Sequence, residues 1–216
     1  MTAGTLFFAP SPTISSTAST FLQHLTALEP SFPPELHVEP ICVTAPIPEL
    51  TKLFGCFFVY SSSDVSAAQP WLDKVSACAG APVVMNTVAP MTPAEFAQSQ
   101  AALLNFGYRG SARTVTIPQF TPKTIETTAK HLERAPLNPV TMWLAHRLRG
   151  GTPSTRPDVA EGSCFGCREA HWMFEIVPLV GEGQDGTQEQ EWARAFETDM
   201  RGTGECLEWT YHALVG

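Results

Sequence analysis

The sequence predicts an α+β protein: one mostly antiparallel β-sheet with helices packed on one face, whose open face forms a ligand pocket. Three observations lead to this prediction. Short apolar runs rich in β-branched and aromatic residues recur along the 216 residues. Amphipathic stretches with helix-capping signals lie between many of them. At two places strands follow one another directly, as in hairpins, which is typical of antiparallel sheets.

The expected strands are apolar runs bounded by turn residues. The clearest is LFGCFFVYS, a near-continuous apolar run that indicates a buried strand. The strands that we expect are Thr5 to Ala9, Leu36 to Val43, Leu53 to Ser61, Pro82 to Val88, Ala112 to Phe120, Pro139 to Leu148 and Ala170 to Val180.

The expected helices follow capping residues. Thr92 stands as N-cap before Pro93, with Glu95 at the third helical position, and TPKTIE and SSSD supply similar starts. The helices that we expect are Thr13 to Leu28, Asp64 to Ala79, Thr92 to about Asn105, Thr121 to about Arg134, Gln188 to Met200 and a short one within Glu205 to Leu214.

Composition limits the classes of protein that fit. A hydrophobic content of 44% over 216 residues suits one core, so we expect a single domain, 1–216. The net charge of −8, with 13 basic residues and no basic run, argues against nucleic-acid and anionic-membrane partners. No apolar run approaches a membrane span and no secretory signal is seen, so we expect a cytoplasmic protein with reduced thiols.

The most informative stretch is SCFGCREAHWMFEIVPLV, from Ser163 to Val180. Cys164, Cys167 and His171 have a spacing that zinc could use, but a structural zinc site needs four ligands and no second pair follows. A redox pair normally opens a helix, whereas this one precedes a strand. We therefore favour two loop cysteines and expect no metal and no cofactor.

Four local patterns, in this order along the chain, carry a resemblance to a known family. They are LFGCFFVYSSSDVSAAQPWLDKV, then APVVMNTVAPMTPAEFAQ with NFGYRG, then WLAHRLRGG, and finally FGCR with HWMFEI, followed by the helix-like EQEWARAFETDM. Together they resemble the substrate-binding domain of the berberine-bridge-enzyme-like FAD-linked oxidoreductases. The resemblance covers nearly the whole chain.

The departures from that family shape the expected function. Such oxidoreductases carry a separate FAD-binding domain before this one, whereas this sequence enters the first expected strand directly after Met1. It contains no Gly-rich diphosphate loop. The resemblance therefore implies a truncated, stand-alone substrate platform without the flavin-binding half.

Side-chain alternation along two strands suggests the site residues. In Pro139 to Leu148, Trp143 and Arg147 share one face and His146 has the other. In Ala170 to Val180, His171 and Glu175 share a face opposite to Trp172, Phe174 and Ile176, which suit packing under helices. We expect Glu175, His171, Trp143 and Arg147 to meet on one half-apolar face, as in a ligand pocket.

Roles follow from the resemblance, in which the open sheet face meets flavin and substrate. Glu175 and His171 would exchange protons with a bound carbonyl compound, and Arg147 or Arg168 would stabilise an enolate or phenolate. Trp143, Tyr60 and Tyr108 would stack on a flat ligand, with His146 as a further binding residue. Each has a structural alternative: Glu175 in a buried ion pair with Arg147 or Arg168, Arg168 holding its loop, His171 in solvent, and His146 and the tryptophans in the core.

Three functions stay open. The first is a flavin-independent, redox-neutral cyclase or isomerase, working by aldol, dehydration or pericyclic chemistry on a conjugated carbonyl, polyketide-like metabolite. The second is a non-catalytic small-molecule binding protein. The third is the substrate domain of an oxidoreductase whose FAD-binding subunit is separate. A homodimer that covers part of the open face would protect it from solvent.

Overall fold

The computed structural model describes residues 1–46, 50–101, 107–148 and 170–208. In these residues every strand pair is antiparallel, and the main sheet has the order β4-β1-β3-β2-β8-β9-β7, with β5 beside β1. Two further strands, β6 and β10, pair with each other. The strands are β1 (Thr2–Phe8), β2 (Leu36–Pro46), β3 (Leu50–Tyr60), β4 (Val83–Asn86), β5 (Ala89–Pro90), β6 (Tyr108–Arg109), β7 (Arg113–Ile117), β8 (Thr141–Leu148), β9 (His171–Pro178) and β10 (Val180–Gly181).

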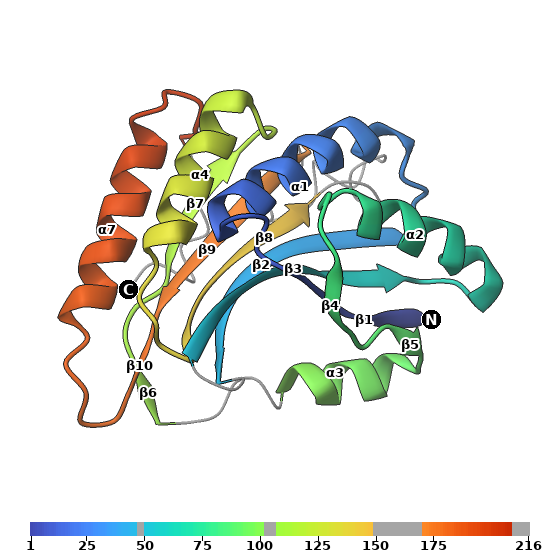
Figure 1. Ribbon diagram of the computed structural model, residues 1–216, viewed down its shortest axis with the longest axis horizontal. Helices are drawn as coiled ribbons and strands as arrows, with labels where there is room; N and C mark the ends of the chain where they lie inside the picture. The colour runs from blue at the N-terminus through green and yellow to red at the C-terminus, as the bar shows by residue number, and fades with distance from the viewer. Residues whose placement is uncertain (47–49, 102–106, 149–169, 209–216) are drawn as a thin grey trace, which may run out of the picture.

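Helices cover one face of the main sheet. Figure 1 shows α1, α2, α4 and α7 above the sheet and α3 on the opposite side, below the end formed by β1. The α-helices are α1 (Ile14–Leu28), α2 (Gln69–Ala77), α3 (Pro93–Ala101), α4 (Pro122–Arg134) and α7 (Thr187–Arg201), and the short 3-10 helices are η1 (Glu29–Ser31) and η2 (Val65–Ala68). The expected α+β class, a mostly antiparallel sheet with packed helices, is confirmed.

Capping explains where three of the helices begin. The Thr13 hydroxyl accepts a hydrogen bond from the backbone N–H of Ser16 and starts α1. Thr121 and Thr124 form a reciprocal capping box at the start of α4. Before α3, a carboxylate oxygen of Glu95 accepts the backbone N–H of Thr92 at 2.7 Å, as the sequence predicts.

Aromatic side chains fill the space between helices and sheet. Phe21 of α1 packs against Phe8 and Phe54, with ring centroids 5.4 and 5.5 Å away. The predicted inward face of β9 is confirmed, since Trp172, Phe174 and Ile176 are all buried. Each such side chain stabilises the fold by roughly 1.5–3 kcal/mol through its burial.

Several boundaries differ from the expectation. The strand expected from Ala112 to Phe120 ends at Ile117, because Pro118 has no N–H to donate to a ladder. The first strand begins earlier, at Thr2, where it pairs with Tyr60. No helix forms in the tail up to 208, where the Leu207 N–H instead donates to the carbonyl of Thr116. The rest of that expected helix lies outside the described residues.

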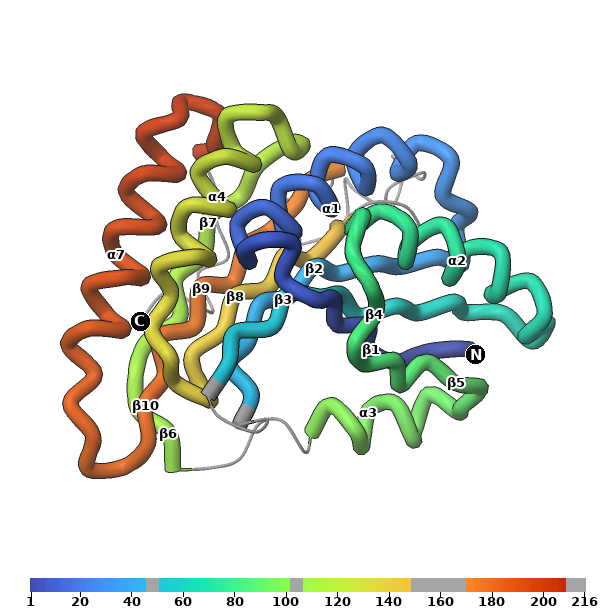
Figure 2. The backbone as a smooth tube through the Cα atoms, viewed as in Figure 1, coloured from blue at the N-terminus to red at the C-terminus, as the bar shows by residue number. Residues whose placement is uncertain are grey.

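The first strand and the last described helix lie on opposite sides of the molecule. In Figure 2, β1 lies at the right and α7 at the left, in agreement with the strand order. No helix among the described residues is both long and apolar enough to span a bilayer.

Candidate functional site on the open face

The strand register decides which residues share the face that α1, α4 and α7 leave open. Directly opposite residues of an antiparallel pair lie on the same face. Trp143 stands opposite Ile176, and Glu175 stands opposite Leu144. The expectation that Trp143 and Arg147 share a face with Glu175 and His171 is therefore wrong. Alternation gives the faces within one strand, but the offset between two strands depends on their register.

Four polar side chains from three strands form the network of the open face. A carboxylate oxygen of Glu39 on β2, Oε1, lies 2.7 Å from Nε2 of His37 and 2.9 Å from Nδ1 of His146 on β8. Nε2 of His146 then lies 3.4 Å from Oε2 of Glu175 on β9, an ion-pair distance without hydrogen-bond geometry. We call these four residues, His37, Glu39, His146 and Glu175, the open-face cluster.

The charges of the cluster follow from its burial and its contacts. Burial alone would lower the pKa of His146, but the neighbouring carboxylates of Glu175 and Glu39 outweigh it and raise that pKa to about 10. Burial would raise the pKa of Glu39, but the bonds to His146 and His37 outweigh it and lower that pKa to about 2. At neutral pH, His146 is thus an imidazolium and Glu39 a carboxylate.

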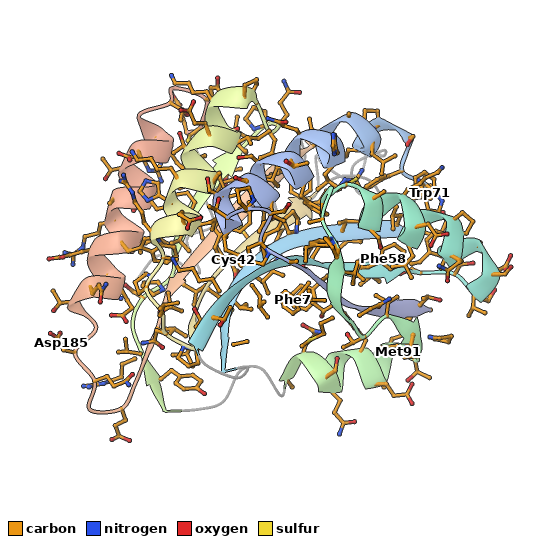
Figure 3. All side chains as sticks on the ribbon, in the orientation of Figure 1. Phe7, Cys42, Phe58, Trp71, Met91 and Asp185 are labelled. Atoms are coloured by element: carbon orange, nitrogen blue, oxygen red, sulfur yellow. The ribbon has the colours of Figure 1, made fainter. Side chains whose placement is uncertain are left out.

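Apolar side chains surround the cluster on the same face. Leu144 stands opposite both Ile41 and Glu175 across β2, β8 and β9. Phe7 stands opposite Gly55, and Figure 3 shows Phe7 on the side of the sheet away from α1. A Cβ on Gly55 would lie 2.7 Å from the Phe7 ring, so the missing side chain lets this ring lie across the strand. The face thus combines a few ionisable groups with a flat apolar surface.

Arg147 lies on the helix-covered face, where it has structural contacts. Its Nε is 2.9 Å from Oε1 of Glu29, and both side chains are more than nine-tenths buried. Its guanidinium also lies over the ring of Phe32, 5.1 Å from the centroid. The register places it on the face opposite Glu175, so the expected role of Arg147 at the open face does not fit its position.

Two of the expected aromatic ligand contacts belong to the core. Trp143 is fully buried and meets Phe174 edge-on at 5.2 Å between ring centroids. Tyr60, opposite Leu36, is 8% exposed and packs in the same core. The side chains of Trp143 and Tyr60 therefore lie on the wrong face to stack on a ligand beside Glu175.

The remaining expected residues lie apart from one another. Tyr108 is half-buried in β6, opposite Gly181 of β10. His171 is on the open face, but it is buried and stands opposite Leu148, four residues from Glu175 along β9. Two strand residues four apart are separated by about 13 Å. Arg168, Cys164 and Cys167 lie outside the described residues.

Three of the other thiols are buried in the core. Cys42 and Cys56 are almost fully buried, as expected, and burial raises the pKa of Cys42 to about 12. Burial also raises the pKa of Cys78 to about 11. Across the part of the chain that the structure describes, no three His, Cys, Asp or Glu side chains are grouped as metal ligands.

A hollow of about 420 Å³ lies elsewhere, between the start of α7 and the β6–β10 pair. Figure 3 shows its lining residue Asp185 at this end of the molecule. The Asp185 carboxylate accepts hydrogen bonds from Thr187, and the side chains of Gln184 and Gln190 bond to the backbone of Gly181 and Pro178. With these groups engaged locally, the hollow offers less for chemistry than the open-face cluster.

His37 and Glu39 are the functional candidates that the sequence interpretation missed. Both lie in LHVEPICV, a strand predicted from Leu36 to Val43, where they alternate with Leu36 and Val38. Two ionisable residues at positions i and i+2 of a buried strand signal a polar cluster on one face. That signal was present, but His146, the partner of Glu39, is more than a hundred residues away.

Comparison with solved structures identifies related folds. The chain matches 6-hydroxy-D-nicotine oxidase from Arthrobacter nicotinovorans at a TM-score of 0.72 and 14% identity, over 100% of this chain and 46% of that one. It matches the oxidoreductase of the terminal step of gilvocarcin biosynthesis at 0.72 and 12%, over 97% and 44%. A berberine bridge enzyme variant described as a reticuline dehydrogenase matches at 0.64 and 14%, over 93% and 41%.

No family model matches the sequence. No curated protein matches it either. The solved structures are FAD-linked oxidoreductases of the berberine-bridge-enzyme family, and the chain spans less than half the length of each.

The FAD of these neighbours can be tested against the described open face. A dinucleotide diphosphate needs a Gly-rich turn at a helix start or cationic side chains. The strands of the open face carry Glu39 and Glu175 and, within their described residues, no lysine or arginine on that side. These described residues do not fit the diphosphate of a dinucleotide. What the comparison establishes is the fold: this chain is folded like somewhat less than half of a berberine-bridge-enzyme-type oxidoreductase.

Proposed function

We propose that the open sheet face binds a conjugated carbonyl or phenolic metabolite and moves a proton on it without a net redox change, as a cyclase or isomerase does. One observation supports this most directly. Glu175, with a side chain 23% exposed, lies beside the imidazolium of His146 on a face that is otherwise mostly apolar. A carboxylate in such a place suits general-base catalysis.

The residues of the open-face cluster have different roles in this proposal. Glu175 has contact with solvent and lies at the end of the chain of contacts, so it is the group that takes and returns the proton. Glu39 and His146 are tied to each other at 2.9 Å and keep their charges. The neighbouring side chain of Leu144, half-buried opposite Glu175, gives a flat ligand an apolar surface to lie on.

A second candidate function comes from the structural neighbours. All are FAD-linked oxidoreductases, so the same face would present substrate to a flavin held by another part of an assembly. In that case Glu175 would bind and orient the substrate, and the flavin would supply the redox chemistry. Cofactor dependence separates the two functions.

The test uses purified protein and a panel of β,γ-unsaturated cyclic ketones, beginning with 3-cyclohexenone. Their rearrangement to the conjugated enone needs one proton removed and one returned, and it is followed by ultraviolet absorbance. We expect turnover without added FAD and a loss of about 100-fold or more in Glu175→Gln. Glu182→Gln, at an exposed position, is the matched control.

The same experiment includes the contrary outcomes. The protein is scanned from about 300 to about 500 nm and titrated with FAD by calorimetry before the assay. Turnover only in the presence of FAD, with oxygen consumed, would replace the isomerase with the oxidoreductase. If the wild type converts every ketone no faster than Glu175→Gln does, proton transfer by this face is rejected.

A further inference from the structure

We propose that His146 stabilises the substrate oxyanion formed when Glu175 takes a proton, and that Glu39 is the positioning residue that keeps His146 charged and oriented. This inference rests on the proposed function above. It assigns a catalytic role to His146 through the N–H on Nε2, which would touch the substrate oxygen directly.

The geometry leaves one N–H of His146 available. Nδ1 donates to Oε1 of Glu39 at 2.9 Å, which fixes the ring. Nε2 is buried and has no hydrogen-bond partner in the described part of the chain, although Oε2 of Glu175 lies 3.4 Å away. Nε2 thus meets the Glu175 carboxylate without a directional hydrogen bond, which most buried donors have. A ligand oxygen beside Glu175 would supply the missing acceptor.

No other described cation competes for this role beside Glu175. Arg147, the expected oxyanion partner, pairs with Glu29 on the opposite face. Arg113 of β7 stands opposite Ile176, so it also lies on the helix-covered side, where it pairs with Glu197. Among the described residues, His146 is thus the positive group within ion-pair distance of Glu175.

The proton balance of the step is simple. The C–H or O–H bond of the substrate breaks, and an O–H bond forms on Glu175. The electron pair moves to the substrate oxygen and gives an enolate or phenolate. Glu175 loses its negative charge as the substrate gains one, so the imidazolium exchanges a carboxylate partner for an oxyanion partner. The total charge is unchanged, and Glu175 then returns the proton to another carbon of the enolate, which completes the isomerisation and restores both charges.

The charges also exclude His146 as the base. The carboxylates of Glu39 and Glu175 keep its pKa near 10, whereas that of Glu39 is near 2. Transfer of the proton from His146 to Glu39 would be strongly unfavourable, so this pair is a fixed charge and does not relay protons. Glu175 remains the residue that exchanges them.

The first test measures oxyanion binding without turnover. Glu175→Gln resembles the neutral state that Glu175 reaches after taking the proton. We expect this variant to bind 4-nitrophenolate about 10-fold or more tightly than the wild type does, measured by its visible absorbance. Adding His146→Gln should abolish the gain, whereas adding His24→Gln, at an exposed position of α1, should retain it. No gain in Glu175→Gln, or a gain that survives loss of His146, overturns the proposal.

The second test measures the charge of His146 in the ligand-free protein. Imidazole ¹⁵N shifts should show both ring nitrogens protonated from about pH 5 to about pH 8.5, and Glu39→Gln should bring the titration of His146 down into this range. A neutral His146 at pH 7 in the wild type contradicts the proposal.

The two tests separate this inference from the proposed function. If ketone turnover depends on Glu175 but phenolate binding is unchanged by His146→Gln, the proposed function is retained and the role of His146 is rejected. If phenolate binding follows His146 but no ketone is turned over without FAD, the oxyanion site stands and the redox-neutral function falls.

Discussion

Arg147 and Glu29 form a buried ion pair, with Nε and Oε1 2.9 Å apart, on the face of the sheet that lies away from Glu175. His146, the residue before Arg147 on β8, forms an ion pair with Glu39 on the other face of the sheet. Two adjacent residues of one strand thus support the fold on one side and the candidate chemistry on the other.

Breaking the Arg147–Glu29 pair should destabilise the protein without touching the open-face cluster. Arg147→Met removes the guanidinium that pairs with the buried Glu29 carboxylate, at a cost of roughly 3–5 kcal/mol. Urea unfolding measures this loss. The double variant Arg147→Met with Glu29→Gln should recover part of the stability, and the exposed Arg194→Met is the control. A single variant as stable as the wild type would contradict the structural role.

Stability should depend on pH through the Glu39–His146 pair. The pKa of His146 is raised from 6.5 to about 10, so its contribution is complete below about pH 6.5 and is lost as the pH rises through about 10. The pKa of Glu39 is lowered from 4.5 to about 2, so its contribution is complete above about pH 4.5 and is lost as the pH falls through about 2.

Both shifts describe one network, and together they stabilise the fold by an amount on the order of 3 kcal/mol, most fully between about pH 4.5 and 6.5. Urea midpoints at pH 5.5 and 9 should therefore differ more in the wild type than in His146→Gln. Equal pH dependence in the two proteins would show that the pair does not stabilise the fold.

His131 should give the opposite pH dependence. Burial lowers its pKa below 6.5, although a bond of 2.9 Å to Asp199 partly opposes the shift. A histidine whose pKa is lower in the folded protein than in the unfolded chain makes the fold less stable as the pH falls below the unfolded-state pKa. His131→Phe, which can keep the stacking on Phe196 at 4.6 Å, should flatten the fall of the melting temperature from pH 6.5 to 5. A steeper fall in the variant would reject this assignment.

Gly55 should tolerate no side chain. A Cβ at this position would lie 1.9 Å from the carbonyl oxygen of Leu6 and 2.7 Å from the Phe7 ring. Because the first contact is with backbone, β1 and β3 would have to separate, and we expect Gly55→Ala to cost about 3 kcal/mol or more. Gly181→Ala, which meets only the flexible Gln184 side chain, should cost far less in the same unfolding assay.

The sequence was sufficient for most of the elements and for the inward face of β9. Helix starts at Thr13, Thr92 and Thr121 follow from hydrogen bonds between near neighbours, and these are local. The burial of Trp172 and Phe174 follows from alternation within one strand. Such features depend on only a few consecutive residues.

The candidate site was only partly predictable, because it depends on contacts between distant strands. Glu175 was placed on the open face correctly, yet Trp143 and Arg147 were assigned to it through a wrong register. A shift of one residue between β8 and β9 exchanges His146 for Arg147 at that face. The length of the 149–169 connection does not determine this register, and Glu39 reaches His146 only through the pairing of β2 with β8.

The sheet is assembled from two groups of strands that are distant in sequence. Strands β1 to β4 come from the first ninety residues, and β7 to β9 from the second half of the chain. The ladder between β2 and β8 that joins them has only two paired positions, Ile41 with Leu144 and Cys42 with Trp143. The Glu39–His146 ion pair crosses this same junction. A substitution that changes the charge of Glu39 or His146 therefore also changes how firmly the two groups of strands hold together.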